Sequence, residues 1–200
     1  MFTGIVENVG EISMVEESGD GLRVGIKVSW GGELKNGVSV CVSGVCLTVE
    51  SHSEDGFVAF LSTETLNCSN LKELREGSFV NLERSMPYVN EDDIEGRFDG
   101  HIVQGHVDAT TKIIEINQIG EDWEYGFIIP DKFGKYMVKK GSITIDGISL
   151  TIADINEEKL TVAIIPTTYS ETTLCKRGVG DTVNIEVDIL AKYTEKLLAG

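Results

Sequence analysis

The chain has 200 residues, a length that suits one large domain or two domains of about a hundred residues each. Its 17 Lys and Arg against 33 Asp and Glu give a net charge of −16, which argues against nucleic-acid-binding and polybasic membrane-surface proteins, because both need clustered cations. A hydrophobic content of 41% excludes disorder, and no apolar run reaches the roughly 20 residues of a membrane span. The N-terminus lacks a secretory signal, so we expect a soluble, cytoplasmic protein; an organellar address reached through a cleaved transit peptide stays open.

Short runs of β-branched residues bounded by Gly, Asn or Asp dominate the pattern. In chain order they predict strands over 38–42, 57–61, 142–145 and 160–165. Glycine is abundant at 22 residues and proline scarce at 3, which suits the tight turns of an all-β fold. Brief helices are predicted only at two positions within the two halves and at the C-terminus: 69–74, 171–174 and the last fourteen residues, where Leu190, Tyr193, Leu197 and Leu198 recur at helical spacing.

The chain also matches itself at an offset of 103 residues. Segment 38–49 falls on 141–152, and segment 65–83 falls on 168–186. At an offset of 101, Gly4-Ile5-Val6-Glu7 falls on Gly105-His106-Val107-Asp108. The identical pairs within these segments include Ser39/Ser142, Gly44/Gly147, Leu47/Leu150, Thr48/Thr151, Asn81/Asn184 and Glu83/Glu186. A duplicated set of about six short strands predicts two tandem, pseudo-symmetric, six-stranded Greek-key barrels followed by a C-terminal helix.

The acidic, glycine-ended segment 88–96 is typical of a linker. We therefore predict an N-terminal barrel over 1–92, a C-terminal barrel over 93–187 and a helix over 188–200. The apolar stripe of that helix has no obvious partner inside the chain. Since an exposed apolar face usually packs on another subunit, the sequence predicts a homo-oligomer.

A duplicated barrel suggests two equivalent pockets, each lined by matching segments from the two halves. The segments are 4–6 with 105–107, 46–48 with 149–151, and 60–65 with 163–168. Their Ser and Thr side chains supply hydrogen-bonding groups without charge. Each such residue taken alone is explained as well by β-propensity on a pleated surface, but six matched segments favour binding sites.

The two copies differ at positions that carry chemistry. Cys46 stands where the second copy has Ser149, and His106, Lys140 and Asp188 replace Ile5, Gly37 and Ser85. A thiol, an imidazole, an ammonium and a carboxylate are groups that shuttle protons and add to substrates covalently. Taken singly, Lys140 is also explained as a surface lysine and Asp188 as a cap at a strand end.

Other kinds of site have little support in the sequence. His101 and His106 are five residues apart, so on a straight strand they point to opposite faces, and no C-x-x-C pair occurs; we expect no metal site. A Cys46/His106/Asp188 hydrolase triad lacks a nucleophile elbow and is not favoured.

Six motifs together resemble the riboflavin synthase family over essentially the whole chain. They are MFTGIVE at 1–7, GVCLTV at 44–49, VNLER at 80–84, GHIVQGHVD at 100–108, IDGISLT at 145–151 and VNIEVD at 183–188. The resemblance implies a homotrimer of two-barrel subunits joined through a C-terminal helix. It also implies a transferase that needs no metal or organic cofactor. Two molecules of 6,7-dimethyl-8-ribityllumazine would exchange a four-carbon unit, giving riboflavin and 5-amino-6-ribitylaminouracil.

In that family the active site holds two substrate molecules, between the N-terminal barrel of one subunit and the C-terminal barrel of its neighbour. The catalytic groups that the resemblance implies are Ser39, Cys46, His106, Ser149, Thr151 and Asp188. The ligand-contacting residues that it implies are Gly4, Ile5, Val6, Cys46, Leu47, Thr48, Phe60, Leu61, Ser62, Thr63, Glu64, Thr65, Gly105, His106, Val107, Lys140, Ser149, Leu150, Thr151, Ala163, Ile164, Ile165, Pro166, Thr167 and Thr168.

The family pattern is broken at two places, where Asp99 replaces Gly in Gly-Gly-His and Ser43 replaces Asn in Asn-Gly-Val-Cys. Two alternatives stay open: a non-catalytic lumazine- or flavin-binding fluorescent protein of the same fold, and a purely structural β oligomer. Retention of Cys46, His106, Ser39 and Asp188 favours the enzyme. The sequence leaves open which residue abstracts the proton and which barrel holds the donor.

Overall fold

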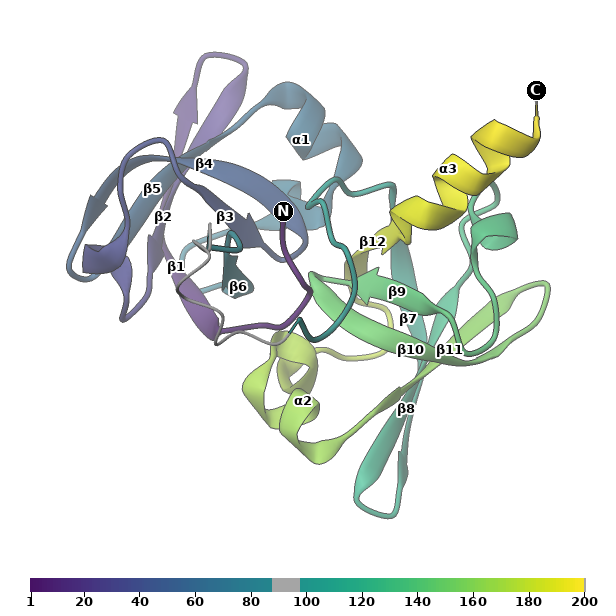
Figure 1. Ribbon diagram of the computed structural model, residues 1–200. Helices are drawn as coiled ribbons and strands as arrows, with labels where there is room; N and C mark the ends of the chain where they lie inside the picture. Colours follow the sequence, from purple (N-terminus) through teal and green to yellow (C-terminus); the bar gives the residue numbers. More distant parts are fainter. Residues whose placement is uncertain (88–97, 200) are drawn as a thin grey trace, which may run out of the picture.

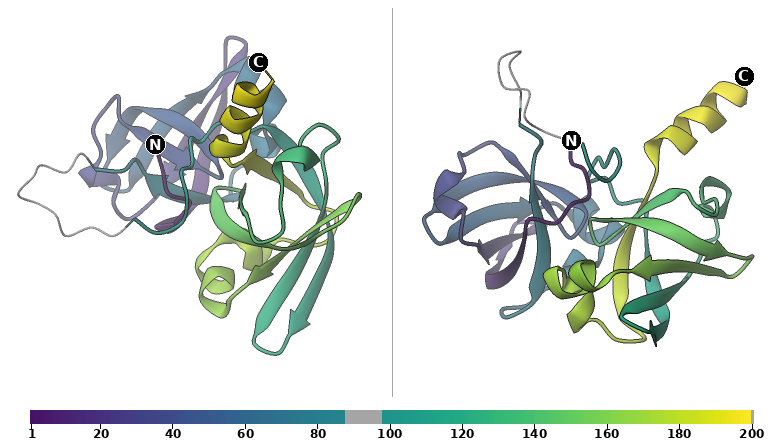
Figure 2. Two further views of the ribbon diagram at one scale, coloured as in Figure 1. Left: turned by 45° about the vertical axis from the view of Figure 1, so that its right-hand side comes forward. Right: turned by 60° about the horizontal axis from the view of Figure 1, so that its bottom comes forward.

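The computed structural model describes residues 1–87 and 98–199, which form two closed antiparallel barrels lying side by side (Figures 1 and 2). This confirms the predicted all-β, two-barrel fold. The predicted linker at 88–96 and the domain boundary between 92 and 93 lie outside the described residues. None of the helices in the described ranges is long and apolar enough to cross a membrane.

Each barrel has six strands in the same order. The first closes as β1-β2-β5-β4-β3-β6, and the second repeats this order as β7-β8-β11-β10-β9-β12. In both, three hairpin-connected strands are followed by a fourth that returns beside the first of them, which is the predicted Greek key. The bounds are β1 Asn8–Ser18, β2 Gly21–Lys27, β3 Ser39–Val42, β4 Val45–Ser53, β5 Gly56–Leu61, β6 Phe79–Arg84, β7 Ala109–Ile119, β8 Asp122–Ile128, β9 Ser142–Ile145, β10 Ile148–Ile155, β11 Lys159–Ile164 and β12 Thr182–Val187.

Period-two alternation assigns the side chains of β4 and β10 to two faces. Val45, Leu47 and Val49 are buried in the core of the first barrel, whereas Cys46 is half-buried and Thr48 exposed. The second barrel repeats this arrangement with Ile148, Leu150 and Ile152 inside and Ser149 and Thr151 outside. Because successive strand residues point to opposite faces, the apolar residues fill the barrels while the reactive side chains face outward.

The predicted brief helices at 69–74 and 171–174 are 3-10 helices, η2 (Asn70–Glu73) and η4 (Thr173–Lys176). Each follows a six-residue α-helix that the sequence pattern did not reveal. These and the remaining helical segments are α1 Thr63–Cys68, α2 Pro166–Glu171, η1 Gly31–Glu33 and η3 Gly134–Tyr136.

The two pocket-lining segments predicted at 60–65 and 163–168 therefore begin at the ends of β5 and β11 and continue into α1 and α2. Ser62 Oγ accepts a hydrogen bond from the Thr65 N–H at 3.2 Å and caps α1. Pro166 occupies the first turn of α2, where its fixed φ and missing N–H are tolerated. Because Ser62 and Pro166 start helices, strands β5 and β11 end there even though the residues that follow favour strands.

The predicted C-terminal helix is present as α3 (Ile189–Leu198), and it projects from the second barrel (Figure 2). Glu195 bonds to Lys135 and Tyr136, and Lys192 Nζ lies 2.6 Å from Asp108 Oδ1. These contacts tie one side of α3 to its own barrel. The side chains left exposed are the predicted apolar stripe: Leu190, Tyr193, Leu197 and Leu198.

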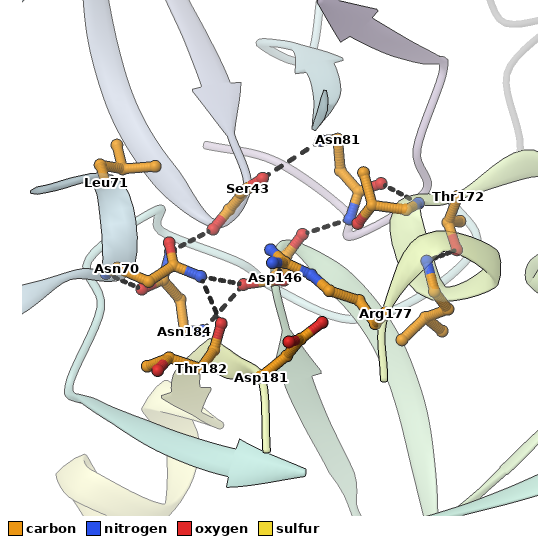
Figure 3. Close-up of polar contacts among 12 residues, drawn as sticks. Ser43, Asn70, Leu71, Asn81, Asp146, Thr172, Arg177, Asp181, Thr182 and Asn184 are labelled. Atoms are coloured by element: carbon orange, nitrogen blue, oxygen red, sulfur yellow. Dashed lines mark hydrogen bonds and ion pairs between the residues drawn. The ribbon is translucent and has the colours of Figure 1, made fainter. Parts of the chain in front are cut away.

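The barrels meet through a pseudo-symmetric set of amide hydrogen bonds (Figure 3). The Asn81 side chain donates to the Asp146 carbonyl and accepts from the Thr173 N–H, both at 2.8 Å. Its counterpart Asn184 donates to the Ser43 carbonyl at 2.8 Å and accepts from the Asn70 N–H at 2.7 Å. These residues, which we call the inter-barrel cluster, account for the Asn81/Asn184 identity in the internal alignment.

The symmetry of the inter-barrel cluster breaks at one pair of turn residues. Ser43 Oγ accepts only a long hydrogen bond, 3.2 Å, from the Asn81 N–H. The buried Asp146 carboxylate accepts from the Asn184 N–H at 2.8 Å and from Arg177 Nη2 at 2.7 Å. The departure of Ser43 from the family pattern thus concerns the contact between the barrels.

Candidate functional site

Residues 1–7 precede the first barrel and residues 98–108 precede the second. Each of these crossing segments passes over and packs on the other barrel. Phe2 and Val103 pair between the two segments, with backbone hydrogen bonds of 2.8 and 3.0 Å. Beyond this pair, Val6 packs against the core of the second barrel and Val107 against the core of the first. Each outward-facing reactive strand is therefore covered by a segment from the opposite half of the chain.

One glycine in each crossing segment lies directly against a reactive residue of the opposite barrel. The Gly4 carbonyl accepts a hydrogen bond from the Ser149 N–H at 2.8 Å, and the Gly105 carbonyl accepts one from the Cys46 N–H at 2.8 Å. Both glycines have positive φ, +78° and +79°. A Cβ on Gly4 would stand 2.6 Å from the Ser149 Cβ, and one on Gly105 2.7 Å from the Cys46 Cβ. Only glycine fits these two positions.

A buried glutamate anchors each crossing segment. Glu83 accepts from the N–H groups of Thr3 and Gly4, at 2.6 and 2.9 Å. Glu186 accepts from the N–H groups of Gln104, Gly105 and His106, at 2.7 to 2.9 Å. Burial raises the pKa of both carboxyls, although the N–H donors act in the opposite direction. In the sequence this pair stands out only as an identity within the repeat, and no role was predicted for it.

A cavity of about 510 Å³, which we call the second-barrel pocket, lies where the first crossing segment meets the second barrel. The crossing segment, β10 and the α2 region all contribute to its wall. The predicted ligand-contacting residues that line it are Gly4, Ile5, Val6, Ser149, Thr167 and Thr168. Its volume lies within the range of roughly 300–1,000 Å³ that holds small organic ligands.

A buried histidine stands beside this pocket. His101 Nδ1 lies 2.6 Å from Ser149 Oγ, and its Nε2 lies 3.2 Å from Thr144 Oγ1. Burial lowers the pKa of His101, and the Asp188 carboxylate acts against this shift. The imidazole is thus kept neutral at neutral pH, and its Nδ1 can accept the Ser149 proton when Nε2 carries the hydrogen. The sequence offers His101 only as a metal ligand and carries no signal for this contact.

Comparison with known proteins agrees with this geometry. The family described as Lumazine binding domain matches twice, over residues 3–85 and 104–188. A riboflavin synthase of Mycobacterium bovis is 47% identical over 204 residues, covering 99% of this chain and 98% of that protein. Those of Actinobacillus pleuropneumoniae and Bacillus subtilis are 43% and 39% identical over 99% of this chain and 90% of their own. The chain belongs to the riboflavin synthase family.

Solved structures give the same fold. LumP complexed with riboflavin superposes with a TM-score of 0.82 at 23% identity, over 94% of this chain and 99% of that one. LumP complexed with 6,7-dimethyl-8-(1'-D-ribityl) lumazine gives a TM-score of 0.80. At this identity the likeness concerns the two-barrel architecture alone. The relatives in sequence, by contrast, are named as enzymes of the riboflavin synthase family.

The residues that the family resemblance implies as catalytic are spread over both halves of the chain. Ser39 is half-buried at the start of β3, opposite Thr48 on β4. Thr151 is exposed on β10, opposite Ser142. Asp188 Oδ1 accepts from the Leu190 N–H at 2.9 Å and caps α3. Asp188 follows the end of β12, but it caps the start of a helix rather than a strand end.

Other predicted ligand residues differ in how they could meet a ligand. Leu47, Leu61, Leu150 and Ile164 are buried in the barrel cores, so only their backbone atoms could reach a ligand. Lys140 is exposed with φ +70°, in a backbone region that favours glycine, and its counterpart Gly37 has φ +87°. The role of Lys140 in ligand binding stays a prediction.

Proposed function

We propose that the chain catalyses the dismutation of two molecules of 6,7-dimethyl-8-ribityllumazine. One molecule gives up a four-carbon unit and becomes 5-amino-6-ribitylaminouracil, and the other gains the unit and becomes riboflavin. The observation that carries this proposal is the crossing of the two segments. It builds two sites of the same architecture, Gly4 on Ser149 and Gly105 on Cys46, in a single chain. A reaction that consumes the same molecule twice needs two such sites.

The reactive groups at these sites then supply the addition and the proton transfer. Cys46 or Ser39 assists nucleophilic addition at the acceptor ring, and His106 or a nearby hydroxyl removes a proton from the acidic 7-methyl group of the donor. In the second site, His101 polarises the Ser149 hydroxyl across 2.6 Å. Thr151 and Lys140 bind the substrate beside it. Much of the acceleration comes from holding two stacked ring systems in register.

The two working halves of the site come from different subunits in this proposal. The apolar stripe of α3 is exposed at 59% for Leu190 and 82% for Leu197, while salt bridges hold the other side of the helix to its barrel. Such a helix suits packing against another copy of the chain. We propose a homotrimer in which the first barrel of one subunit faces the second barrel of its neighbour.

The direct test is incubation of the purified protein with 6,7-dimethyl-8-ribityllumazine alone. We expect one riboflavin from two substrate molecules, followed by its absorbance. Cys46→Ser and Ser149→Ala are each expected to lower turnover by about 10²-fold, since each removes a group placed at the chemistry. Ligand binding without turnover would indicate the fluorescent-protein alternative, and no binding would leave a structural oligomer.

Mixing the two variants tests the arrangement between subunits. After co-refolding, some sites combine an intact first barrel from the Ser149→Ala chain with an intact second barrel from the Cys46→Ser chain. Activity is then expected to return to a sizeable fraction of the wild-type value. Turnover that stays at the level of the separate variants would contradict a shared site while leaving the chemical assignment intact.

The pH dependence gives a second test, because Asp188 acts on the His101 imidazole. Asp188→Asn removes the carboxylate charge, so the pKa of His101 falls further below its ordinary 6.5. The acidic limb of kcat/KM is expected to move to lower pH. Asn still caps a helix, so α3 is retained. A limb that stays in place or moves to higher pH would refute the role of His101 in polarising the Ser149 hydroxyl.

The same imidazole also makes the stability of the folded chain depend on pH. Burial depresses the pKa of His101 in the folded state. Its neutral imidazole therefore contributes fully to the free energy of unfolding at a pH above 6.5, the pKa of the unfolded chain. That contribution is lost as the pH falls through the folded pKa, since the unfolded chain takes up the proton first. The denaturation midpoint of Asp188→Asn should therefore fall over a wider range of acidic pH than that of the wild type.

A further inference from the structure

A second cavity, of about 580 Å³, lies between the barrels and shares no lining residue with the second-barrel pocket. Its wall is built from η2 and β6 of the first barrel together with β7, η4 and β12 of the second. Ser43 and Asn70 of the inter-barrel cluster line it together with Arg177 and Thr182, whose side chains lie close to the cluster in Figure 3. We call this space the inter-barrel cavity. The proposed dismutation makes no use of it.

The inter-barrel cavity gathers positive charge in an acidic protein. Four of the 17 basic residues of the chain line it, Arg75, Lys112, Lys176 and Arg177, although the net charge is −16. Two acidic residues, Glu73 and Asp181, also contribute to its lining. Asp181 Oδ2 already accepts a hydrogen bond from the Gly178 N–H at 2.8 Å. Cations that converge on a concave surface attract anionic ligands.

Two buried groups on the wall have no hydrogen-bond partner among the described residues. They are the hydroxyl of Thr173, a residue only 2% exposed, and Nε of Arg177. Arg177 Nη2 bonds to Asp146 Oδ2 at 2.7 Å, which leaves the Nε–H free to donate. Both atoms are buried beneath the cavity surface rather than exposed on it. Since buried polar groups are rarely left unpaired, we expect the two side chains to turn toward an acceptor in the cavity.

The other half of the pseudo-symmetric interface is fully paired at the matching position. Asn70 occupies the position equivalent to Thr173 in the repeat. Its amide nitrogen donates to Asp146 Oδ1 at 3.1 Å and to the Thr182 carbonyl at 3.0 Å, and its oxygen accepts from Asn184 at 2.8 Å. Asn70 lines the same cavity, so within the described part of this interface the unpaired donors are confined to η4 and the residue that follows it, Arg177.

We propose that the inter-barrel cavity binds a small organic phosphate monoester. Lys112 and Lys176 would supply charge to the phosphate, since guanidinium and ammonium groups are common phosphate ligands. Arg177 Nε and the Thr173 hydroxyl would donate to phosphate oxygens once their side chains turn toward the cavity. The cavity is larger than a bare oxyanion requires. Phe79 is 42% exposed on its wall, and Lys176 Nζ lies 4.2 Å from the ring centroid, so an apolar organic portion has a surface to contact.

Binding there stabilises the arrangement of the two barrels. Residues from both barrels line the cavity, so the occupied site favours the folded chain over any state in which the barrels have separated. The ligand is therefore expected to raise the melting temperature in a saturable manner. Turnover of the lumazine substrate is not required for this effect, so a failure of the proposed enzymatic function would leave the measurement unaffected.

The experiment titrates the full-length protein with phenyl phosphate and with inorganic phosphate, by calorimetry and by thermal melting at constant ionic strength. We expect saturable binding of phenyl phosphate, weaker binding of inorganic phosphate and none of benzyl alcohol. Thr173→Val should keep the melting temperature of the free protein, because the hydroxyl has no partner to lose among the described residues, and should weaken binding about tenfold. Lys112→Gln/Lys176→Gln should weaken binding by at least about tenfold.

Lys27→Gln is the matched control, since it removes an exposed lysine of β2 that does not line the cavity. The dissociation constant of this variant for phenyl phosphate should equal that of the wild type. Excess riboflavin should leave phenyl phosphate binding unchanged. The proposal is overturned by an absence of saturable binding at millimolar ligand, by equal affinities in Thr173→Val and wild type, or by competition with riboflavin.

Discussion

Asn184→Leu is expected to lower the free energy of unfolding by about 4 kcal/mol, because three buried partners each lose a hydrogen bond worth roughly 1–3 kcal/mol when left unpaired. The Asn184 side chain joins the Ser43 carbonyl, the Asn70 N–H and the Asn70 side-chain oxygen. All of these groups lie in the contact between the barrels. Urea denaturation followed by fluorescence measures the loss, which is a large part of the stability of a typical domain.

The pseudo-symmetry supplies a graded comparison. Asn81→Leu removes side-chain bonds to two partners, the Asp146 carbonyl and the Thr173 N–H, so its loss is expected to be smaller than that of Asn184→Leu. Asn117→Leu on β7 is the control, because among the described residues this exposed side chain hydrogen-bonds only to Glu115. Its effect should stay within about 0.5 kcal/mol. Equal effects in all three variants would refute the role of the inter-barrel cluster.

Gly105→Ala is expected to reduce turnover by about 10²-fold, because small misplacements of reacting groups have effects of that order. The new Cβ would stand 2.7 Å from the Cys46 Cβ and 2.8 Å from the Cys46 N, so β4 and the crossing segment must move apart. Positive φ adds strain of about 1–2 kcal/mol, and overpacking adds about 1–3 kcal/mol to the loss of stability. Steady-state kinetics and denaturation measure the two effects.

Two other glycines separate backbone strain from collision. Gly120 has φ +66°, and a Cβ added there would meet nothing within 4 Å, so Gly120→Ala carries the strain alone. Gly178 has neither a positive φ nor a close neighbour, and Gly178→Ala should be neutral. If Gly105→Ala matched Gly120→Ala in stability and retained normal kcat, close packing of the crossing segment on Cys46 would not be required for function.

The repeat alone determined much of the architecture. Period two in 38–42 and 142–145 predicts strands that are present as β3 and β9, and the offset of 103 residues predicts two barrels of one topology. The helical spacing from Leu190 to Leu198 predicts α3. These features depend on local alternation and on duplication, both of which are visible along the chain. The short helices α1 and α2 leave no periodic pattern, because a single residue starts each of them: the Ser62 cap in α1 and Pro166 in α2.

Length, composition and the repeat also predicted which segments form the sites, but not which barrel each segment serves. Gly4 lies on Ser149 and Gly105 on Cys46, so each site combines the two halves of the chain. His101 meets Ser149 across 48 positions in sequence, and Asn184 meets Ser43 across 141. Such contacts leave no periodic signal, because they depend on how two closed barrels pack through buried hydrogen bonds. The sequence by itself determined two barrels and their reactive residues; only the tertiary structure decided the crossing that brings those residues together.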